Sequence, residues 1–478
     1  MTNRSGFLLT VIATLGGAAL FPACGSDSSS GVAGTGGVSP FAANGGVIMG
    51  AGGTGPIGTA GNTPVGAGGM TPLGGGGTPV SGSGGSLLGM GGSLPGAGGS
   101  GATSGGGVAG MAIGGTAGTA GASGAAGMGA GGAPLFPPFP TNGMPITAPD
   151  NTWTYMDIAD TKCRDGSTAG LAVSLNSKSD KVMIFLQGGG ACFDSLTCLA
   201  NPANAAGQKA AVTTGIFDRT NAANPVKDWN YVFIPYCTGD TFMGTNDNGM
   251  VTGVTGVQHF MGRPNMEKFL NRIVPTFPKA TQVLLTGISA GGFGAASNSY
   301  LVQRAFGSTP VTMLDDSGPP MSSKYIPACL QDKWRTTWGL DNSILADCGT
   351  ACPNHSDYTL DYTKFVLKLA DSRGGTVKSG LLDSNDDGII TAFYGYGQNN
   401  CTGSLSTPVP AAQYDAGLLD FRATVTALTP NFGTYYPAGT VHTWLASATL
   451  YTEAEGGTKL IDWVTAIVNG TGVSQVGM

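Results

Sequence analysis

The sequence predicts an α/β fold, a mainly parallel sheet with helices on both faces, preceded by a long segment without regular structure. Two observations predict this fold. Short apolar segments alternate with stretches of helical periodicity after residue 147, which is typical of a parallel sheet. The chain before that point consists largely of Gly, Ala, Ser, Thr and Pro. We therefore expect a signal peptide over 1–23, a disordered linker over 24–146 and one α/β domain over 147–478.

The first residues have the pattern of an export signal. Arg4 supplies a positive start, and the apolar stretch Gly6–Phe21 is too short to span a bilayer as a stable helix. It ends at Ala23-Cys24, which resembles a bacterial lipoprotein signal whose cysteine is lipidated. The two residues before Ala23 are unusual for such a signal, so simple cleavage near Ala23 is the alternative. We expect a protein of the cell envelope, anchored by a lipid at Cys24, or a secreted protein if Cys24 carries no lipid.

The linker lacks the residues that a packed core requires. Asp27 is the only charged residue from Gly25 to Pro149. Such a segment cannot bury enough apolar surface to offset its ordering entropy. A Gly-rich coil of roughly 120 residues has a root-mean-square span of about 60 Å. The linker would therefore let an anchored domain stand off a membrane and sweep a cell-wall layer.

The domain that follows has room for one large core of roughly 330 residues. Its continuous apolar segments predict buried strands at Lys181–Leu186, Tyr231–Ile234, Gln282–Leu285 and Val311–Leu314. Helices are predicted at Asn265–Val274, Ala295–Ala305 and Lys459–Val468. Ligands of such sheets bind beyond the carboxyl ends of the strands, so the residues after each strand are the candidates for a functional site. The formal charge of −6 without a basic cluster argues against nucleic acid as a partner.

The nine cysteines are an odd number. If Cys24 carries a lipid, the remaining eight form an even set, which predicts disulfide bonds in an exported chain. A zinc site is the alternative, because Cys348 and Cys352 have the spacing of zinc ligands, but no second Cys or His pair accompanies them. We therefore expect disulfides and no metal or other cofactor.

The pentapeptide Gly287–Gly291 has the sequence Gly-Ile-Ser-Ala-Gly and follows a predicted strand directly. This is the context of a G-x-S-x-G nucleophile elbow, in which glycines flank a serine held in a strained turn before a helix. A chance match is the alternative in a chain with 83 glycines, yet the Gly-rich linker contains no such motif. We expect Ser289 to be a nucleophile.

A nucleophilic serine needs a base, which is usually histidine. The chain has three histidines, and His442 lies after Ser289, as the Ser-Asp-His order of such enzymes requires. His259 precedes the serine and His355 lies in a loop bounded by cysteines, so we expect structural roles for both. The glycine run Gly188–Gly190 after an early strand could supply backbone N–H groups for an oxyanion hole, together with the amide of Ala290.

Several motifs together resemble the pectin acetylesterases and the Notum carboxylesterases, in the order in which that family has them. They are Cys163-Arg-Asp-Gly-Ser167, Phe185-Leu-Gln-Gly-Gly-Gly-Ala-Cys192 with Cys198, Pro235-Tyr-Cys-Thr-Gly-Asp240, Gly287-Ile-Ser-Ala-Gly-Gly292 and Leu314-Asp-Asp-Ser-Gly318. The resemblance covers most of residues 150–445 and implies an α/β-hydrolase fold, hydrolysis of carboxylic esters, and oxyanion donors at Gly189, Gly190 and Ala290.

The same resemblance implies two disulfides, Cys192–Cys198 and Cys163–Cys237, and leaves the partners of Cys329, Cys348, Cys352 and Cys401 open. Two positions depart from the family pattern. Ala191 stands where the plant enzymes commonly have Trp, and His442 is followed by Thr443-Trp444 where the family often has Cys. These departures concern the acyl and polymer pockets more than the chemistry.

The acid that orients His442 has several candidates. Asp387 resembles the acid of the family, because it follows a strand and precedes a helical sequence. Asp386, Asp383 and Asp316 remain alternatives, and Asp316 is better placed as a structural hydrogen-bond partner beneath the site.

The segment around Asp387 also matches the start of a calcium-binding EF-hand loop. Five of its residues fit loop positions 1, 3, 5, 6 and 8, namely Asp383, Asn385, Asp387, Gly388 and Ile390. Position 12 would be Tyr394, which cannot supply the bidentate carboxylate of such a loop. The sequence therefore favours a catalytic acid over a metal ligand.

These residues predict an exported serine carboxylesterase that removes acyl groups, acetyl in particular, from a polysaccharide or another polymer through an acyl-enzyme. One alternative is a polyester depolymerase or lipase with the same triad. Another is a surface-tethered protein whose hydrolase fold only binds. The expected partners are an ester substrate and, through the lipid, a membrane; we expect a monomer.

Overall fold

The computed structural model describes residues 139–209, 212–372, 374, 377–403 and 405–478. The signal peptide expected over 1–23, the lipidation site expected at Cys24 and the linker up to residue 138 lie outside the described residues. Among the helices of the described part, none combines the length and the apolar character that a membrane span requires.

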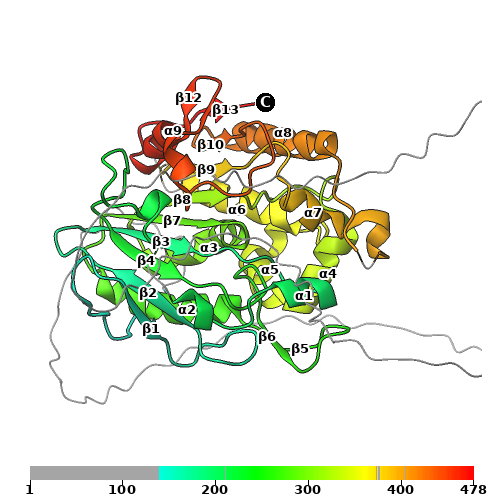
Figure 1. The fold of residues 1–478 in the computed structure, drawn as a ribbon, viewed down its shortest axis with the longest axis horizontal. Helices are drawn as coiled ribbons and strands as arrows, with labels where there is room; N and C mark the ends of the chain where they lie inside the picture. Colours follow the sequence, from blue (N-terminus) through cyan, green and yellow to red (C-terminus); the bar gives the residue numbers. More distant parts are fainter. Residues whose placement is uncertain (1–138, 210–211, 373, 375–376, 404) are drawn as a thin grey trace, which may run out of the picture. The chain divides into compact units, whose positions relative to one another are not determined.

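A nine-stranded, mostly parallel sheet forms the centre of the described domain (Figure 1). Its order is β1-β2-β4-β3-β7-β8-β9-β10-β13, in which β2 pairs antiparallel with both β1 and β4 and the other neighbouring strands pair parallel. The strands are β1 Thr154–Asp157, β2 Gly170–Ser174, β3 Lys181–Leu186, β4 Asn230–Ile234, β7 Gln282–Ile288, β8 Val311–Asp316, β9 Ser379–Leu382, β10 Phe432–Tyr435 and β13 Gln475–Val476. The four apolar segments predicted as strands are thus β3, β4, β7 and β8, and the expected fold class is confirmed.

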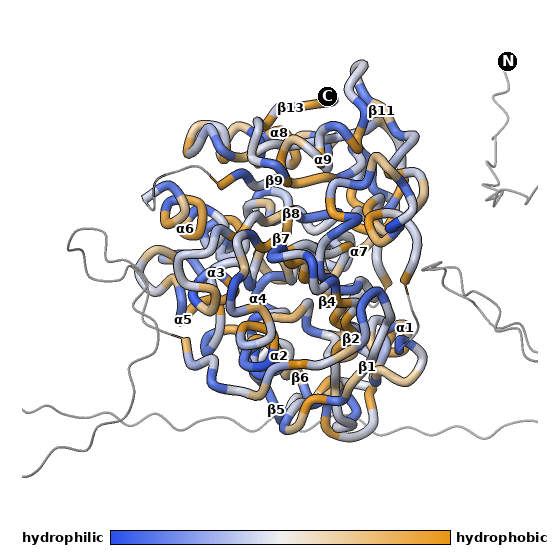
Figure 2. Tube along the Cα trace, turned by 90° about the vertical axis from the view of Figure 1, so that its left-hand side faces the viewer, coloured by the Kyte–Doolittle hydropathy of each residue, from blue (hydrophilic) through white to orange (hydrophobic). Residues whose placement is uncertain are grey.

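Two short antiparallel pairs lie outside this sheet: β5 Asn246–Gly249 with β6 Gln258–Phe260, and β11 Ala454–Glu455 with β12 Thr458–Lys459. In both views of the chain the β1 end of the sheet and the β13 end lie on opposite sides, and α8 and α9 lie near β13 (Figures 1 and 2). The α-helices are α1 Ser195–Ala200, α2 Gly262–Thr276, α3 Ala290–Phe306, α4 Ala328–Trp338, α5 Ile344–Cys348, α6 Tyr358–Ser372, α7 Ile390–Gly395, α8 Ala411–Leu428 and α9 Leu460–Val468.

The central strands are buried on both faces, which explains why their sequences are continuously apolar rather than alternating. In β3, Ile184 and Leu186 belong to one hydrophobic cluster, whereas Met183 and Phe185 belong to another. The first cluster receives apolar side chains from helices α2 to α8. The second is covered by α9 and by loop residues around 216–229 and 444–450. Helices therefore lie on both faces, but loops cover much of the second face in the described structure.

Residues 139–146 belong to the folded domain, although the sequence analysis assigns them to the linker. Ile146 is buried, and its amide donates to Thr276 Oγ1 of α2 at 2.7 Å. The amide of Gly143 donates to Asn271 Oδ1 at 3.0 Å, and Phe139 packs against the core. The folded domain therefore begins earlier than predicted. The isolated apolar side chains of Phe139 and Ile146 suffice to dock this Pro-rich segment on the core, next to α2.

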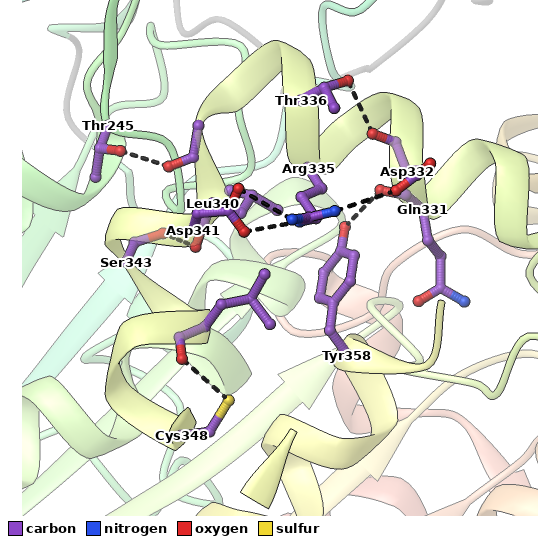
Figure 3. A network of polar contacts seen from close by, with 12 residues as sticks. Thr245, Gln331, Asp332, Arg335, Thr336, Leu340, Asp341, Ser343, Cys348 and Tyr358 are labelled. Carbon is purple, nitrogen blue, oxygen red and sulfur yellow. Dashed lines mark hydrogen bonds and ion pairs between the residues drawn. The ribbon is translucent and has the colours of Figure 1, made fainter. Parts of the chain in front are cut away.

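Helix α4 has one exposed side and one buried side, and its buried side contacts the loop after β3. On its exposed side, Arg335 turns toward Asp332 and Asp341 and donates to Asp341 Oδ1 at 2.7 Å (Figure 3). Exposed ion pairs of this kind contribute at most about 1 kcal/mol. On its buried side, Trp338 Nε1 donates to the carbonyl of Cys192 at 2.8 Å, and Trp334 stacks on Phe393. The buried side therefore supports the loop that carries the glycine run.

Four disulfides stabilise the described domain. Cys163–Cys237 and Cys192–Cys198 are the pairs that the family resemblance implies, and the other four cysteines pair as Cys329–Cys401 and Cys348–Cys352. The zinc-like spacing of Cys348 and Cys352 is therefore that of a bridge. No group of three or more His, Cys, Asp or Glu side chains that could hold a metal ion occurs within the described ranges.

The disulfides differ in the length of chain that they close, and their contributions to stability should differ accordingly. The bridge Cys163–Cys237 has a sequence separation of 74, and Cys348–Cys352 has one of 4. Loop-closure entropy predicts that replacing both cysteines of the first pair by serine lowers the free energy of unfolding by about 4 kcal/mol, against about 2 kcal/mol for the second pair. Guanidinium unfolding under non-reducing conditions measures both values. An equal or larger loss from the shorter loop would contradict the entropic explanation.

Candidate active site

Ser289 lies in a sharp turn between β7 and α3. Its backbone has φ 56° and ψ −122°, a conformation that non-glycine residues rarely adopt and that costs about 1–3 kcal/mol. The glycines on either side cannot carry a side chain here. A Cβ at Gly287 would lie 2.3 Å from the carbonyl oxygen of Gly291, and one at Gly291 would lie 2.0 Å from that of Leu186. The G-x-S-x-G motif therefore forms a tight strand–turn–helix connection with Ser289 at its apex.

The glycine run after β3 passes directly beside this turn. A Cβ at Gly188 would lie 3.0 Å from the Cβ of Ser289. Gly189 and Gly190 have φ values of 155° and 73°, and the carbonyl of Gly189 accepts a hydrogen bond from Asn201 Nδ2 at 2.8 Å. This bond and the Cys192–Cys198 disulfide fix the run beside Ser289.

Several backbone amides near Ser289 have no acceptor among the described residues. They include the amides of Gly189, Gly190 and Ala290, the last of which opens α3. Further along the first turn of α3, the amides of Gly292 and Phe293 donate to the carbonyl of Ser289. Unpaired N–H groups at a helix N-terminus favour negative charge. The site can therefore stabilise an oxygen anion that develops next to the Ser289 hydroxyl.

His442 is paired with Asp387, and Asp387 is held in place by its own loop. His442 Nδ1 lies 2.7 Å from Asp387 Oδ2. The other oxygen, Oδ1, accepts hydrogen bonds from the amides of Ile389 and Ile390 at 2.8 Å each. The Asp387 side chain is fully buried, whereas 17% of the His442 side chain is exposed. An ionised Asp387 accepts a hydrogen bond from the Nδ1–H of a neutral His442, which leaves Nε2 as the proton acceptor.

The remaining candidate acids have other partners. Asp383 Oδ2 accepts from the Tyr414 hydroxyl at 2.5 Å, and Asp316 Oδ2 accepts from the amides of Trp444 and Leu445. Among these carboxyls, Asp387 alone is hydrogen-bonded to His442 within the described structure. The calcium interpretation fits this geometry poorly, because both oxygens of Asp387 already accept hydrogen bonds.

The other two histidines lie in different settings. His259 Nδ1 is 2.7 Å from Asp247 Oδ1, next to the Lys162–Asp247 ion pair, and His355 is exposed in its loop. The hydroxyl of Ser289 is not hydrogen-bonded to His442 in the described structure. Catalytic hydrogen bonds are often long in a site without substrate and tighten when the reacting groups bind.

Asp316 connects the nucleophile turn with the histidine loop. Its carbonyl accepts from the amide of Ser289 at 2.7 Å, and its carboxylate accepts from Trp444 and Leu445 at 2.8 and 2.7 Å. The residue is fully buried, and burial raises the pKa of its carboxyl to about 7, although these two amides lower it. Sequence reasoning gives Asp316 a structural role but does not show that it links both halves of the site.

The raised pKa of Asp316 has a measurable consequence for stability. The pKa of about 7 in the folded state lies above the unfolded value of about 3.9. Between these two pH values the folded protein keeps a proton on Asp316 that the unfolded chain has released. The contribution of Asp316 to stability is thus complete below about pH 4 and is lost as the pH rises to about 7.

Asp316→Asn removes this titration and keeps the shape of the side chain. The free energy of unfolding of the parent, minus that of D316N, should fall by up to about 1.4 kcal/mol per pH unit across this window and stay constant above it. Urea unfolding at a series of pH values measures the difference. A difference that is flat from pH 4 to 7 would rule out a raised pKa at Asp316.

Comparison with known proteins identifies the relatives of this domain. The family model described as Pectinacetylesterase matches residues 150–354, a segment that contains Ser289 and the glycine run but neither Asp387 nor His442. Palmitoleoyl-protein carboxylesterase notum2 of Xenopus laevis is 32% identical over 240 residues, which are 47% of this chain and 42% of that protein. Palmitoleoyl-protein carboxylesterase NOTUM of Drosophila melanogaster is 26% identical over 204 residues, or 39% and 30% of the two chains. This chain thus spans less than half the length of these curated relatives.

A solved structure shows the same fold. The crystal structure of the Wnt deacylase Notum from Drosophila superposes with a TM-score of 0.50 at 20% sequence identity, covering 67% of this chain and 94% of that one. The bacterial origin expected from the N-terminal signal finds no support in these relatives, which come from animals. The motifs, the fold and the matches agree, and the described domain is similar to the pectinacetylesterases and the Notum carboxylesterases.

Proposed function

We propose that this protein is a serine carboxylesterase of the cell envelope that removes acyl groups, acetyl in particular, from a polysaccharide or another acylated polymer. The observation that supports it most is the strained turn at Ser289, which holds a hydroxyl beside several unpaired backbone amides. A turn of this kind costs free energy, and strained backbone of this kind clusters at catalytic positions. The His442–Asp387 pair after the neighbouring strands supplies a base.

The proposed reaction has two steps. His442 Nε2 takes the proton of the Ser289 hydroxyl while the oxygen attacks the ester carbonyl, and the resulting oxyanion is stabilised by the amides of Gly189, Gly190 and Ala290. The proton then passes from His442 to the leaving alcohol, which departs and leaves Ser289 acylated. In the second step His442 activates water in the same way, and the acid product leaves. Asp387 stays ionised throughout and stabilises the imidazolium form of His442.

The relatives support the class of bond and leave the substrate as a proposal. The relatives are named for the removal of palmitoleoyl groups from protein, and the family model is named for the hydrolysis of pectin acetyl esters. All of them are carboxylic esters of a larger molecule. A polymer is proposed as the substrate because the sequence predicts a lipid anchor at Cys24 and a long tether. Together these would give the domain access to an extended matrix.

One feature of the surface favours a second candidate, a polyester depolymerase or lipase with the same triad. Two large apolar side chains lie exposed next to the catalytic pair: Ile389, two residues after Asp387, and Val441, directly before His442. Each is 45% exposed. Exposed apolar residues at the edge of a site favour contact with an apolar substrate.

Hydrolysis of p-nitrophenyl acetate and butyrate by the oxidatively folded protein tests the proposal. Ser289→Ala and His442→Asn should each lower kcat/KM by about 10⁴-fold or more, because serine and histidine act as one unit. Ser297→Ala, on the same helix, and His355→Asn, in an exposed loop, are the matched controls and should retain parental activity. Activity in S289A equal to that of the parent would contradict the proposed nucleophile.

The same preparations distinguish the substrate classes. Release of acetate from an acetylated polysaccharide at a higher kcat/KM than hydrolysis of a short polyester or a long-chain ester supports the polymer deacetylase. The reverse order supports the polyester depolymerase or lipase. A folded, disulfide-intact parent without activity on any ester would leave only a binding function and overturn the proposal.

A further inference from the structure

A second buried carboxyl, that of Asp383, lies behind the proposed catalytic acid. Asp383 directly follows β9, its amide donates to the carbonyl of Tyr435 at 3.0 Å, and the residue is fully buried. Its Oδ2 accepts from the Tyr414 hydroxyl of α8 at 2.5 Å. Its Oδ1 accepts no hydrogen bond from any described residue. Asp387 follows four residues later in the same loop, and its carboxyl lies near enough to raise the pKa of Asp383.

Two carboxyl groups can form a hydrogen bond only if one of them carries a proton, because an ionised carboxylate is an acceptor only. The partners of the two groups show which one carries it. The carboxylate of Asp387 accepts from two amides and from His442 Nδ1, all three of which favour its ionised form. Asp383 accepts from a single hydroxyl. The proton therefore resides on Asp383, and its unpartnered Oδ1 is the oxygen that can bear it.

The surroundings of Asp383 lead to the same assignment. The titratable groups that interact with it among the described residues are acids and phenols, namely Asp387, Asp315, Tyr394, Tyr414 and Tyr436. Burial raises the pKa of Asp383 well above its ordinary range, and the neighbouring Asp387 raises it further. A buried carboxyl with a single hydrogen-bond donor and a carboxylate beside it favours its neutral form.

We propose that Asp383 is a positioning residue that, as a neutral carboxylic acid, donates a hydrogen bond to Asp387 and holds that carboxylate ionised and oriented toward His442. The inference rests on the proposed function, in which Asp387 orients the base. The three donors to Asp387 and the proton of Asp383 together replace the water that a buried carboxylate has lost. No proton is transferred between the two acids during the reaction.

Two substitutions separate this role from simple packing. Asp383→Asn keeps the shape, and its amide can donate to Asp387 while its oxygen accepts from Tyr414. Asp383→Leu fills a similar volume but cannot donate. We expect D383L to lower kcat by about 10- to 100-fold with little change in KM, since it removes one hydrogen bond to a charged group. D383N should recover most of that activity, and Asp386→Asn, which removes a partly exposed charge from the same loop, should behave like the parent.

The pH profile gives a readout that packing does not affect. At alkaline pH the parent loses the proton of Asp383, the two carboxylates then repel each other, and kcat/KM should fall. D383N has no such proton, so its activity should persist to higher pH than that of the parent and of D386N. If D383N loses activity at the same pH as the parent, the inference is overturned. This comparison suffices even if D383L does not fold.

Proton NMR of the full-length, ¹⁵N-histidine-labelled protein tests the inference without reference to turnover. The low-field resonance of His442 Nδ1–H, assigned by its absence in His442→Asn, should persist in D383N and D386N and should shift or disappear in D383L. An unchanged resonance in D383L would overturn the role of Asp383. The parent and its variants could show this pattern of resonances while the parent hydrolyses no ester. That outcome would overturn the proposed function and would still support the hydrogen bond between the two acids.

Discussion

The backbone at Ser289 is the constraint on which the rest of the site depends. A φ of 56° is unfavourable for serine, and the turn persists because its surroundings permit no other path for the chain. The amide of Ser289 is bound by Asp316, its carbonyl accepts from two amides of α3, and the flanking glycines contact backbone oxygens at distances that exclude any Cβ. This local strain is offset by the buried sheet around it, whose central strands are apolar on both faces.

The parallel order of the sheet brings separate parts of the chain to this turn. Strands β3, β7, β8, β9 and β10 are neighbours, so the segments after their carboxyl ends meet at one edge. These segments carry the glycine run, Ser289, Asp387 and His442, and Asp316 is the last residue of β8. Asp316 adds a direct link, since this one residue binds both the turn at Ser289 and the chain just after His442. A change in the position of the histidine loop is therefore coupled to the turn that carries the serine.

Local patterns in the sequence predict the elements that have strong local signals. The strands β3, β4, β7 and β8 could be predicted because burial on both faces makes them continuously apolar. Strands β9 and β10 are only four residues long and contain Gly, Ser or Thr, so their sequences resemble loops. The start of α3 also lacks a helical pattern, because Gly291 in its first turn packs so closely on β3 that a Cβ there would lie 2.0 Å from the carbonyl oxygen of Leu186.

The arrangement of the acids could not be predicted in this way. Asp383, Asp386 and Asp387 lie within one loop. Only the fold determines that Asp387 contacts His442, that Asp383 contacts Tyr414 and that Asp316 binds the chain just after His442. The partners of Cys329 and Cys348 were open for the same reason, since pairing depends on distances between segments that are remote in sequence or on the path of a loop.

Covalent labelling of the folded, full-length protein with a fluorophosphonate tests most directly whether Ser289 is an activated nucleophile. Mass spectrometry of the tryptic peptide that spans 280–304 should locate the adduct on Ser289 in the parent. The label should be absent from Ser289→Ala and should form far more slowly in His442→Asn. A folded parent that remains unlabelled, or an adduct that persists in the S289A variant on another serine, would contradict the account.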